Sequence, residues 1–235
     1  MNTRESASVR VPIGSRWLEG DIESPLKPHG LVLFAHGSGS SRHSPRNQYV
    51  AGVLEQGGFA TFLIDLLTEE EDELDRRTAH LRFDIEMLAE RLVAIIDWLR
   101  GRADTAALPL GLFGASTGGG AALVAAAMRP HDVDAVVSRG GRPDLAGAAL
   151  PRVSAPTLLI VGGLDALVIE MNRAAMAHMR ADAMLEIVPG ATHLFEEPGA
   201  LGRVAALAAE WFSRYLEPAY HSRLSAAASS SQQGR

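Results

Sequence analysis

A serine between two glycines stands at the middle of the chain, in the segment Gly114-Ala115-Ser116-Thr117-Gly118. This G-x-S-x-G spacing is typical of a nucleophilic serine on a sharp turn from a strand into a helix, which raises the hydroxyl above a sheet. The surroundings fit, because the apolar run 110–113 precedes the turn and the small-residue segment 121–128 follows it. Such a serine attacks carbonyl carbons, and it needs a base and a group that orients the base.

His193 is the candidate base. Folds that use this turn place the acid and then the histidine after the serine. His193 follows the short apolar run 185–188, in a loop that leaves the carboxyl end of an expected strand, where open sheets place their sites. The other histidines after Ser116 stand at a helix end (131), inside a helical pattern (178) and at the start of the polar tail (221).

Asp165 is the first choice for the orienting acid, since the apolar strand 157–161 runs into Gly162-Gly163-Leu164-Asp165. A local alternative is that Asp165 only caps the following helix. Asp144 is the reserve candidate, although the surrounding segment 139–144 is rich in turn-forming residues.

Backbone N–H groups must bind the oxyanion that forms when the carbonyl is attacked. One donor is expected from the residue after the nucleophile, Thr117, and the second from the small-residue loop after the strand 31–35. We assign the second donor to Ser38, with Gly39 as a substitute, and expect His36 to brace this loop.

The same loop also permits a competing interpretation. Gly37-x-Gly39-x-x-Arg42 after a strand, with Asp65 ending the next strand, partly matches a dinucleotide-binding fingerprint. Arg42 stands where that fingerprint has its third glycine, and two expected strands precede the loop, so we place this interpretation second.

Strand and helix patterns alternate along the chain, which predicts an α/β fold with a mostly parallel sheet and helices on both faces. We expect one domain over residues 1–220 and a polar tail without fixed structure at 221–235. The acidic segment 66–81 is expected to be a solvated loop or a frayed helix, with a movable flap over the site as the alternative.

Composition excludes several classes. The 235 residues include no cysteine, so disulfides, thiolate metal sites and a cysteine nucleophile are ruled out. The formal net charge of −6 gives no reason to expect nucleic acid or membrane partners. The polar start and the lack of a long apolar run predict a soluble cytoplasmic protein; oligomeric state, including a homo-oligomer, is left open.

Taken together, residues 8–216 resemble the α/β-hydrolase superfamily, and within it the dienelactone hydrolase-like proteins. The resemblance is carried by the loop His36–Arg42, the turn Gly114–Gly119, Gly163-Leu164-Asp165 and Ala191-Thr192-His193, in that order. Dienelactone hydrolases proper have a cysteine where this chain has Ser116. The resemblance therefore implies hydrolysis of small carboxylic esters, lactones or thioesters through an acyl-enzyme on Ser116, with no metal or organic cofactor. A ligand-binding, receptor-like protein with slow turnover and an acyltransferase are the alternatives.

The short connection 138–155 between two expected strands is too short for a lid domain, which favours small, soluble esters with short acyl chains. Three arginines near the expected site, Arg42, Arg82 and Arg139, are candidates for binding a carboxylate on the substrate. The alternative is that they pair with acidic residues of the chain, such as those at 69–72.

Overall fold

A computed structural model describes residues 4–233, except for the side chains of residues 4, 218 and 220–233. Its eight-stranded sheet has the order β1-β2-β4-β3-β5-β6-β7-β8. The strands are β1 (Arg4–Ile13), β2 (Arg16–Pro25), β3 (Leu31–Ala35), β4 (Ala60–Ile64), β5 (Leu110–Ala115), β6 (Ala135–Arg139), β7 (Thr157–Gly162) and β8 (Ala183–Val188). The β1–β2 and β2–β4 pairs are antiparallel and the other pairs are parallel. The expected α/β architecture is confirmed, and it is the α/β-hydrolase fold.

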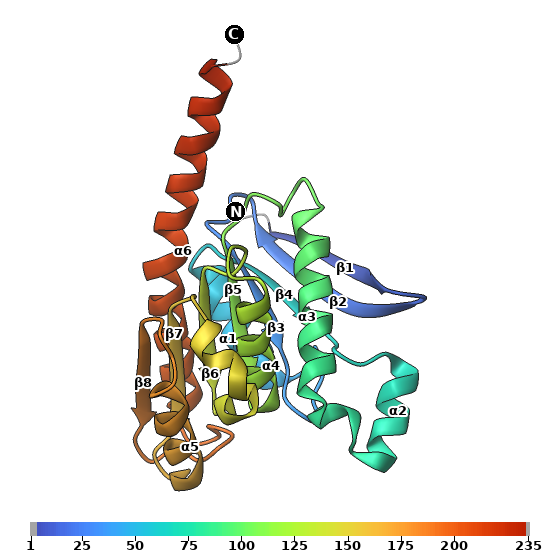
Figure 1. Ribbon diagram of the computed structural model, residues 1–235, viewed down its shortest axis with the longest axis vertical. Helices are drawn as coiled ribbons and strands as arrows, with labels where there is room; N and C mark the ends of the chain where they lie inside the picture. Colours follow the sequence, from blue (N-terminus) through green and yellow to red (C-terminus); the bar gives the residue numbers. More distant parts are fainter. Residues whose placement is uncertain (1–3, 234–235) are drawn as a thin grey trace.

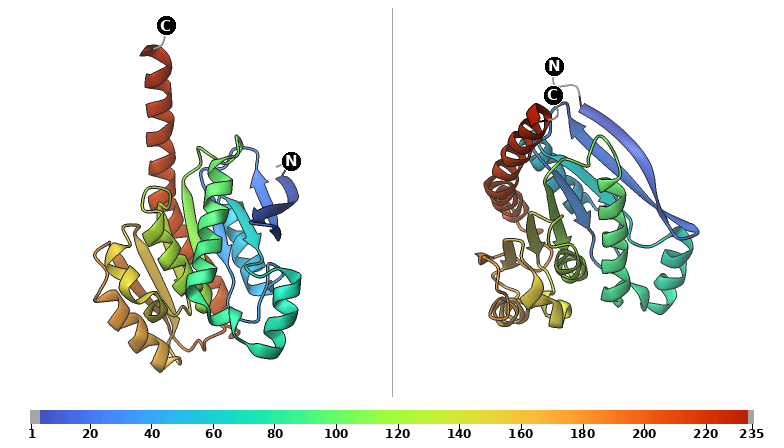
Figure 2. Two further views of the ribbon diagram at one scale, coloured as in Figure 1. Left: turned by 45° about the vertical axis from the view of Figure 1, so that its right-hand side comes forward. Right: turned by 45° about the horizontal axis from the view of Figure 1, so that its top comes forward.

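Helices cover both faces of this sheet. They are α1 (Pro45–Gln56), α2 (Glu69–Thr78), α3 (Ile85–Arg100), α4 (Thr117–Met128), α5 (Ala166–Met176) and α6 (Ala200–Gln233), with 3-10 segments η1 (Leu81–Phe83) and η2 (Pro143–Arg152). Figures 1 and 2 show the layers: α3 and α4 pack on one face, and α1 and α6 on the other. Every residue of the central strands β3, β4, β5, β6 and β7 is buried, as continuous apolar strands between two helical layers must be.

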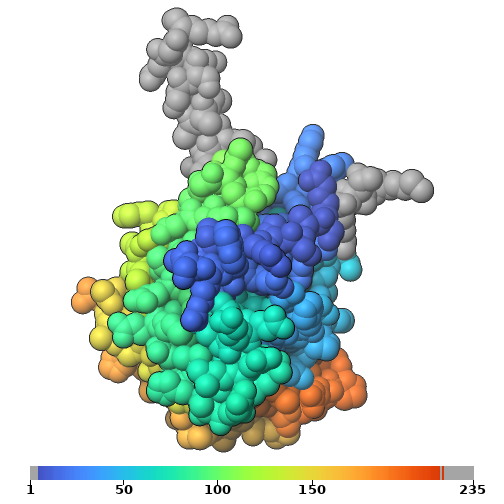
Figure 3. Space-filling model, turned by 90° about the vertical axis from the view of Figure 1, so that its right-hand side faces the viewer, coloured from blue at the N-terminus to red at the C-terminus, as the bar shows by residue number. Residues whose placement is uncertain are grey.

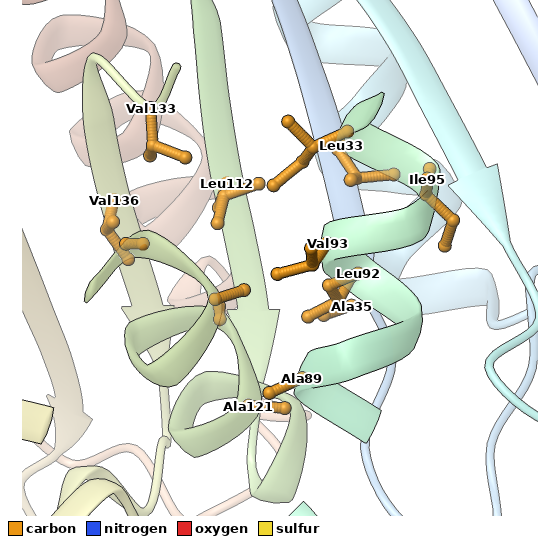
Figure 4. Close-up of a cluster of buried hydrophobic side chains, with 14 of the residues drawn as sticks. Leu33, Ala35, Ala89, Leu92, Val93, Ile95, Leu112, Ala121, Val133 and Val136 are labelled. Carbon is orange, nitrogen blue, oxygen red and sulfur yellow. The ribbon is translucent and has the colours of Figure 1, made fainter. Parts of the chain in front are cut away.

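The α3–α4 face shows how the sheet is packed. In Figure 4, Val93 of α3 lies near Leu33 and Leu112 of the neighbouring strands β3 and β5, and Leu92 lies beside Ala35 of β3. Lower on the same face, Ala89 and Ala121 lie side by side where α3 passes α4. Small side chains at that crossing let the two helices approach closely, which holds the first turn of α4 against the sheet.

The acidic segment 66–81 is more ordered than expected. Its centre is α2, which begins at a capping box: the Thr68 hydroxyl accepts from the Glu71 N–H, and the Glu71 carboxylate accepts from the Thr68 N–H. Burial alone would raise the pKa of Glu71, but hydrogen bonds from Arg91 and Thr68 lower it to about 2. The segment is therefore a capped helix tied to α3, and not a free loop.

The ends of the chain add two observations. The backbone of α6 is assigned through Gln233, into the segment 221–235 for which the sequence predicts no fixed structure. The side chains of 220–233 and residues 234–235 lie outside the described part, so that expectation stays a prediction. Within the described residues, none of the helices combines the length and apolar character needed to cross a membrane.

Candidate active site

Ser116 lies between β5 and α4, at the turn that the sequence predicts. Its backbone has φ 51° and ψ −120°, a conformation that residues other than glycine rarely adopt and that costs about 1–3 kcal/mol. The flanking glycines make the turn possible. A Cβ on Gly114 would lie 2.5 Å from the Gly119 Cα, and one on Gly118 would lie 2.5 Å from the His36 carbonyl oxygen.

His193 and Asp165 form a hydrogen-bonded pair. The His193 Nδ1 lies 2.7 Å from Asp165 Oδ2, and the two side chains are 38% and 18% exposed. Asp165 precedes α5, yet its side chain makes no capping bond there. A neutral imidazole in this pair donates its Nδ1 proton to the carboxylate and leaves Nε2 as a base. The Asp165 side chain therefore binds His193 and does not cap α5.

The loops after β7 and β8 hold this pair together. The Leu164 N–H donates to the Ala191 carbonyl oxygen at 2.9 Å, one residue before Asp165 and two before His193. Gly162 allows the approach, since a Cβ there would lie 2.5 Å from the carbonyl oxygens of Ala191 and Thr192. The strand ends therefore place the acid and the histidine side by side.

The end of β6 connects the serine with the histidine, through its last residue Arg139 and the next residue Gly140. The Ser116 N–H donates to the Arg139 carbonyl oxygen at 3.1 Å. Gly140 has φ 51°, and a Cβ on it would lie 3.4 Å from the His193 ring. Ser116 and the His193–Asp165 pair therefore border the same short segment.

The expected oxyanion donors lie next to the serine. Thr117 is the first residue of α4, so its N–H has no partner in the helical ladder. Gly37 packs against the turn, because a Cβ on it would lie 3.1 Å from the Ser116 Cβ. Ser38 follows in the turn from Gly37 to Ser40. These positions agree with the assignment of Thr117 and Ser38, whose role as donors stays a prediction.

His36 braces that loop. The Leu66 N–H donates to its Nε2 at 3.0 Å, so the proton is on Nδ1, which donates to the Gly37 carbonyl oxygen at 3.0 Å. Burial lowers the pKa of His36, which favours this neutral form.

The three candidate arginines have different surroundings. Arg42 pairs with Asp65, Glu19 and Asp21, so it is held by the chain's own carboxylates. Asp65 also accepts a hydrogen bond from the Arg42 N–H. Its carboxylate is therefore occupied and cannot serve a dinucleotide, so the dinucleotide-binding interpretation is removed.

Arg82 is held by Asp75, whose Oδ2 lies 2.5 Å from the Arg82 Nε. Its Nη1 lies beside Gly39, at 3.3 Å from the place where a Cβ would be. The pairing alternative therefore describes Arg42 and Arg82, although their partners are not the acidic residues 69–72. Asp144, the reserve acid, pairs with Arg142 at 2.8 Å.

Arg139 differs from both. It is only 7% exposed, and its Nε and Nη1 are buried without a hydrogen-bond partner among the described residues. Burial, and then the charge of Arg46, lower its pKa to about 10. Arg46 was not among the candidates from the sequence, where nothing distinguishes it from any arginine at the start of a helix.

A hollow of about 680 Å³ lies between the β1–β2 turn, the loop 40–43 and α2, and its lining includes His36, Arg42 and Asp65. Figure 3 shows this face, with the β1–β2 hairpin in dark blue beside α2 in teal. Ser116 and His193 do not line the hollow. The alternative that the acidic segment 66–81 moves as a flap over Ser116 stays a prediction.

Comparison with known proteins gives a family match over residues 23–218, to the dienelactone hydrolase family. A dienelactone hydrolase of Anabaena variabilis is 62% identical, with a TM-score of 0.89 over 91% of this chain and 99% of that one. The protein Est1E of Butyrivibrio proteoclasticus is 15% identical, with a TM-score of 0.71 over 88% of this chain and 99% of that one, and shares the fold.

Two Mycobacterium tuberculosis proteins, from strains CDC 1551 and H37Rv, are 59% identical over 208 residues and are provisionally named phosphoribosyl transferases. The match covers 88% of this chain but 46% of each relative. The chain thus spans about half the length of these curated relatives.

Proposed function

The chain belongs to the dienelactone hydrolase family, and from that premise we propose that it hydrolyses small carboxylic esters, lactones or thioesters through Ser116, His193 and Asp165. The observation that carries the proposal is the strained backbone of Ser116, at φ 51° between β5 and α4. A turn with no chemical role has no need of this conformation, whereas a nucleophile raised above the sheet requires it.

In this mechanism the Ser116 Oγ attacks the carbonyl carbon of the substrate while His193 Nε2 takes the hydroxyl proton. Asp165 accepts from Nδ1 and stabilises the imidazolium that forms. The N–H groups of Thr117 and Ser38 bind the oxyanion. His193 then gives its proton to the leaving alcohol, and a water that it activates releases the acyl group from Ser116.

A preference for small substrates agrees with the lack of a lid domain among the described residues. Between β6 and β7 the chain forms only η2 and short connections, and η2 packs on α4 and α5. The proposed substrates are therefore soluble esters with short acyl chains.

A fluorophosphonate probe tests the activated serine directly. We expect the probe to label Ser116, Ser116→Ala to abolish labelling and His193→Ala to slow it, while Ser15→Ala in the β1–β2 turn leaves it unchanged. Folded protein that is not labelled at any pH between about 6 and 9, or that is labelled at another residue, contradicts the proposal, because a serine nucleophile needs a neutral imidazole as its base. Two results with an ester substrate would favour the alternatives. If Ser116 is labelled but the ester gives only a single burst of product, the protein is slow and receptor-like. If the acyl group is transferred to an added alcohol, the protein is an acyltransferase.

Phosphoribosyl transfer is the second candidate, favoured by the names of the Mycobacterium relatives. Those proteins have about as much sequence outside the match as within it, so we assign that activity to their other half. Incubation of this chain with a phosphoribosyl pyrophosphate donor should release no pyrophosphate. Release that persists in Ser116→Ala would favour the transferase over the esterase.

A further inference from the structure

A buried asparagine lies on the helix that follows the proposed acid. Asn172 belongs to α5, which begins directly after Asp165, and its side chain is fully buried. The other buried residues of this helix, Val168, Ile169 and Ala175, are apolar. An amide on such a face costs free energy unless its polar atoms are hydrogen-bonded. The bonds that Asn172 makes therefore indicate why an amide stands there.

The Asn172 amide joins α5 to the segment that follows β6. Its Nδ2 donates to the Gly141 carbonyl oxygen at 3.0 Å and to the Val168 carbonyl oxygen at 2.8 Å. Val168 lies one turn earlier in the same helix, so that bond stays within α5. Gly141 lies 31 residues earlier in the chain. The bond to Gly141 is therefore a tertiary contact between two loops' ends of the site, α5 after the acid and the chain after β6.

Packing alone does not explain the amide. The Asn172 Oδ1 is buried and has no hydrogen-bond partner among the described residues. A buried oxygen without a partner lowers stability, and asparagine also favours a helix less than leucine does. Leucine has the same branching and carries neither cost. The asparagine is therefore explained by the bonds that its Nδ2 donates, and not by burial.

The segment that receives the tertiary bond also holds the proposed nucleophile. The Ser116 N–H donates to the Arg139 carbonyl oxygen, and the Ser116 carbonyl oxygen accepts from the Arg142 N–H, each at 3.1 Å. Gly141 lies between these two contacts in the chain. A shift of Gly141 is therefore transmitted to both backbone groups of Ser116.

The same segment touches the proposed base. Gly140 directly precedes Gly141, and a Cβ on Gly140 would lie 3.1 Å from the His193 carbonyl oxygen and 3.4 Å from the ring carbon Cε1. The Gly140 N–H donates to the Ile160 carbonyl oxygen of β7 at 2.7 Å. Asn172 holds the segment from the side of α5, next to the point where the segment meets His193.

We propose that Asn172 is a positioning residue of the site, and that its bond to Gly141 sets how Ser116 and His193 face each other. This inference rests on the proposed esterase function. Because Asn172 is fully buried, it acts through the backbone of the segment 139–142 and not on the substrate. A misplacement of about 1 Å between reacting groups costs up to about 100-fold in rate. Loss of the bond should therefore lower kcat and leave KM nearly unchanged, as for an interaction that acts in the transition state alone.

Ester kinetics on Asn172→Leu test the proposal, because leucine removes the Nδ2 donor and the unpartnered Oδ1 together. We expect kcat to fall by about 10- to 100-fold and a fluorophosphonate to label Ser116 more slowly by a similar factor. The Tm should change little, since the loss of the bond is offset by the loss of the unpartnered oxygen. Wild-type kcat in folded Asn172→Leu, or a loss of kcat/KM that comes only from a higher KM, overturns the positioning role while the esterase function stands.

Thr105→Val is the matched control, because it also removes a buried hydrogen bond from a side chain to the backbone. The Thr105 hydroxyl donates to the Leu99 carbonyl oxygen at 2.7 Å. Thr105 precedes β5, so it lies at the opposite end of that strand from Ser116. The control should lower Tm and leave kcat unchanged. An equal loss of kcat in Thr105→Val would show that the effect is not particular to Asn172 and would overturn the proposal.

A second variant and an NMR measurement separate the positioning role from the esterase function. Asn172→Ser is used if Asn172→Leu does not fold; a serine hydroxyl can bond the carbonyl four residues earlier in a helix, so it keeps the Val168 bond and loses the Gly141 bond. In proton–carbon spectra the His193 Cε1–H signal should shift in either variant but not in the control, because Gly140 lies against Cε1. An unchanged signal refutes the positioning role. A shifted signal in a protein that no fluorophosphonate labels refutes the esterase and keeps the connection from Asn172 to His193.

Discussion

Gly118→Ala tests whether the turn at Ser116 depends on close backbone packing. Gly118 is the second residue of α4, and a Cβ there would lie 2.5 Å from the His36 carbonyl oxygen and closer still to that of Ala35. Real Cβ contacts do not fall below 3.0 Å, so the His36 contact alone requires a separation of at least 0.5 Å, from 3.0 − 2.5. Both atoms belong to the backbone, and neither can rotate out of the way.

The size of the effect follows from two opposing contributions. Glycine to alanine inside a helix ordinarily stabilises by about 1 kcal/mol, while overpacking a filled site costs about 1–3 kcal/mol. We expect a net loss of up to about 2 kcal/mol and a Tm lower by up to about 8 °C for a chain of this size. The displaced segment leads into Ser38, the proposed oxyanion donor, and shifts approaching 1 Å cost up to about 100-fold in rate. We therefore expect kcat/KM to fall by about 10- to 100-fold.

Thermal unfolding and ester hydrolysis measure both effects, and Gly52→Ala is the matched control. Gly52 is inside α1, and a Cβ on it would meet nothing within 4 Å. The control should raise stability by about 0.5–1 kcal/mol and leave kcat/KM unchanged. If Gly118→Ala is as stable and as active as Gly52→Ala, the account of the turn is refuted.

Three further predictions concern charge and pH. Asp165→Asn should lower kcat/KM about 10⁴-fold, by analogy with other Ser-His-Asp enzymes, because the amide cannot stabilise the His193 cation; full activity would exclude the assigned acid. Burial lowers the pKa of His36 in the folded protein below 6.5, so the unfolded chain binds the proton at a higher pH than the folded chain does. The contribution of neutral His36 to the free energy of unfolding should therefore be fully present above about pH 6.5 and decrease below it. In His36→Gln the decline in Tm between about pH 7 and 5 should be smaller, and an identical pH profile would contradict this. The pKa of Glu71 is lowered from 4.5 to about 2, so its contribution is present above pH 4.5 and lost as pH falls toward 2. Arg91→Met should weaken this acid dependence of Tm, which an unchanged slope below pH 4.5 would disprove.

The positions of Ser116, Asp165 and His193 could be predicted because local patterns determine them. Each stands in the turn or loop that follows a strand, and parallel strands bring their carboxyl ends to one edge of a sheet. The glycine spacing around Ser116 reports the steric demand of the turn itself. Thr68-Glu69-Glu70-Glu71 is a capping-box pattern from which the start of α2 could be predicted, but the density of acidic residues favours a solvated loop or a frayed helix.

The ion pairs of the arginines could not be predicted in this way. The partners of Arg42 come from β2 and from the end of β4, which are adjacent in space only because the sheet order places them together. Arg139 is buried close to Arg46 at the start of α1, and a sequence does not show that these two distant segments meet. Charge pairing depends on tertiary distance, whereas the turn at Ser116 depends on its neighbours in the chain.

This difference sets what Gly118→Ala should change in the proposed site. The serine is fixed by backbone contacts among β3, β5 and α4, so Gly118→Ala should lower the hydrolysis of every ester by a similar factor. A change in the ratio of kcat/KM between two esters would contradict this account, because the atoms that crowd a Cβ at Gly118 belong to the backbone and not to a group that selects among substrates.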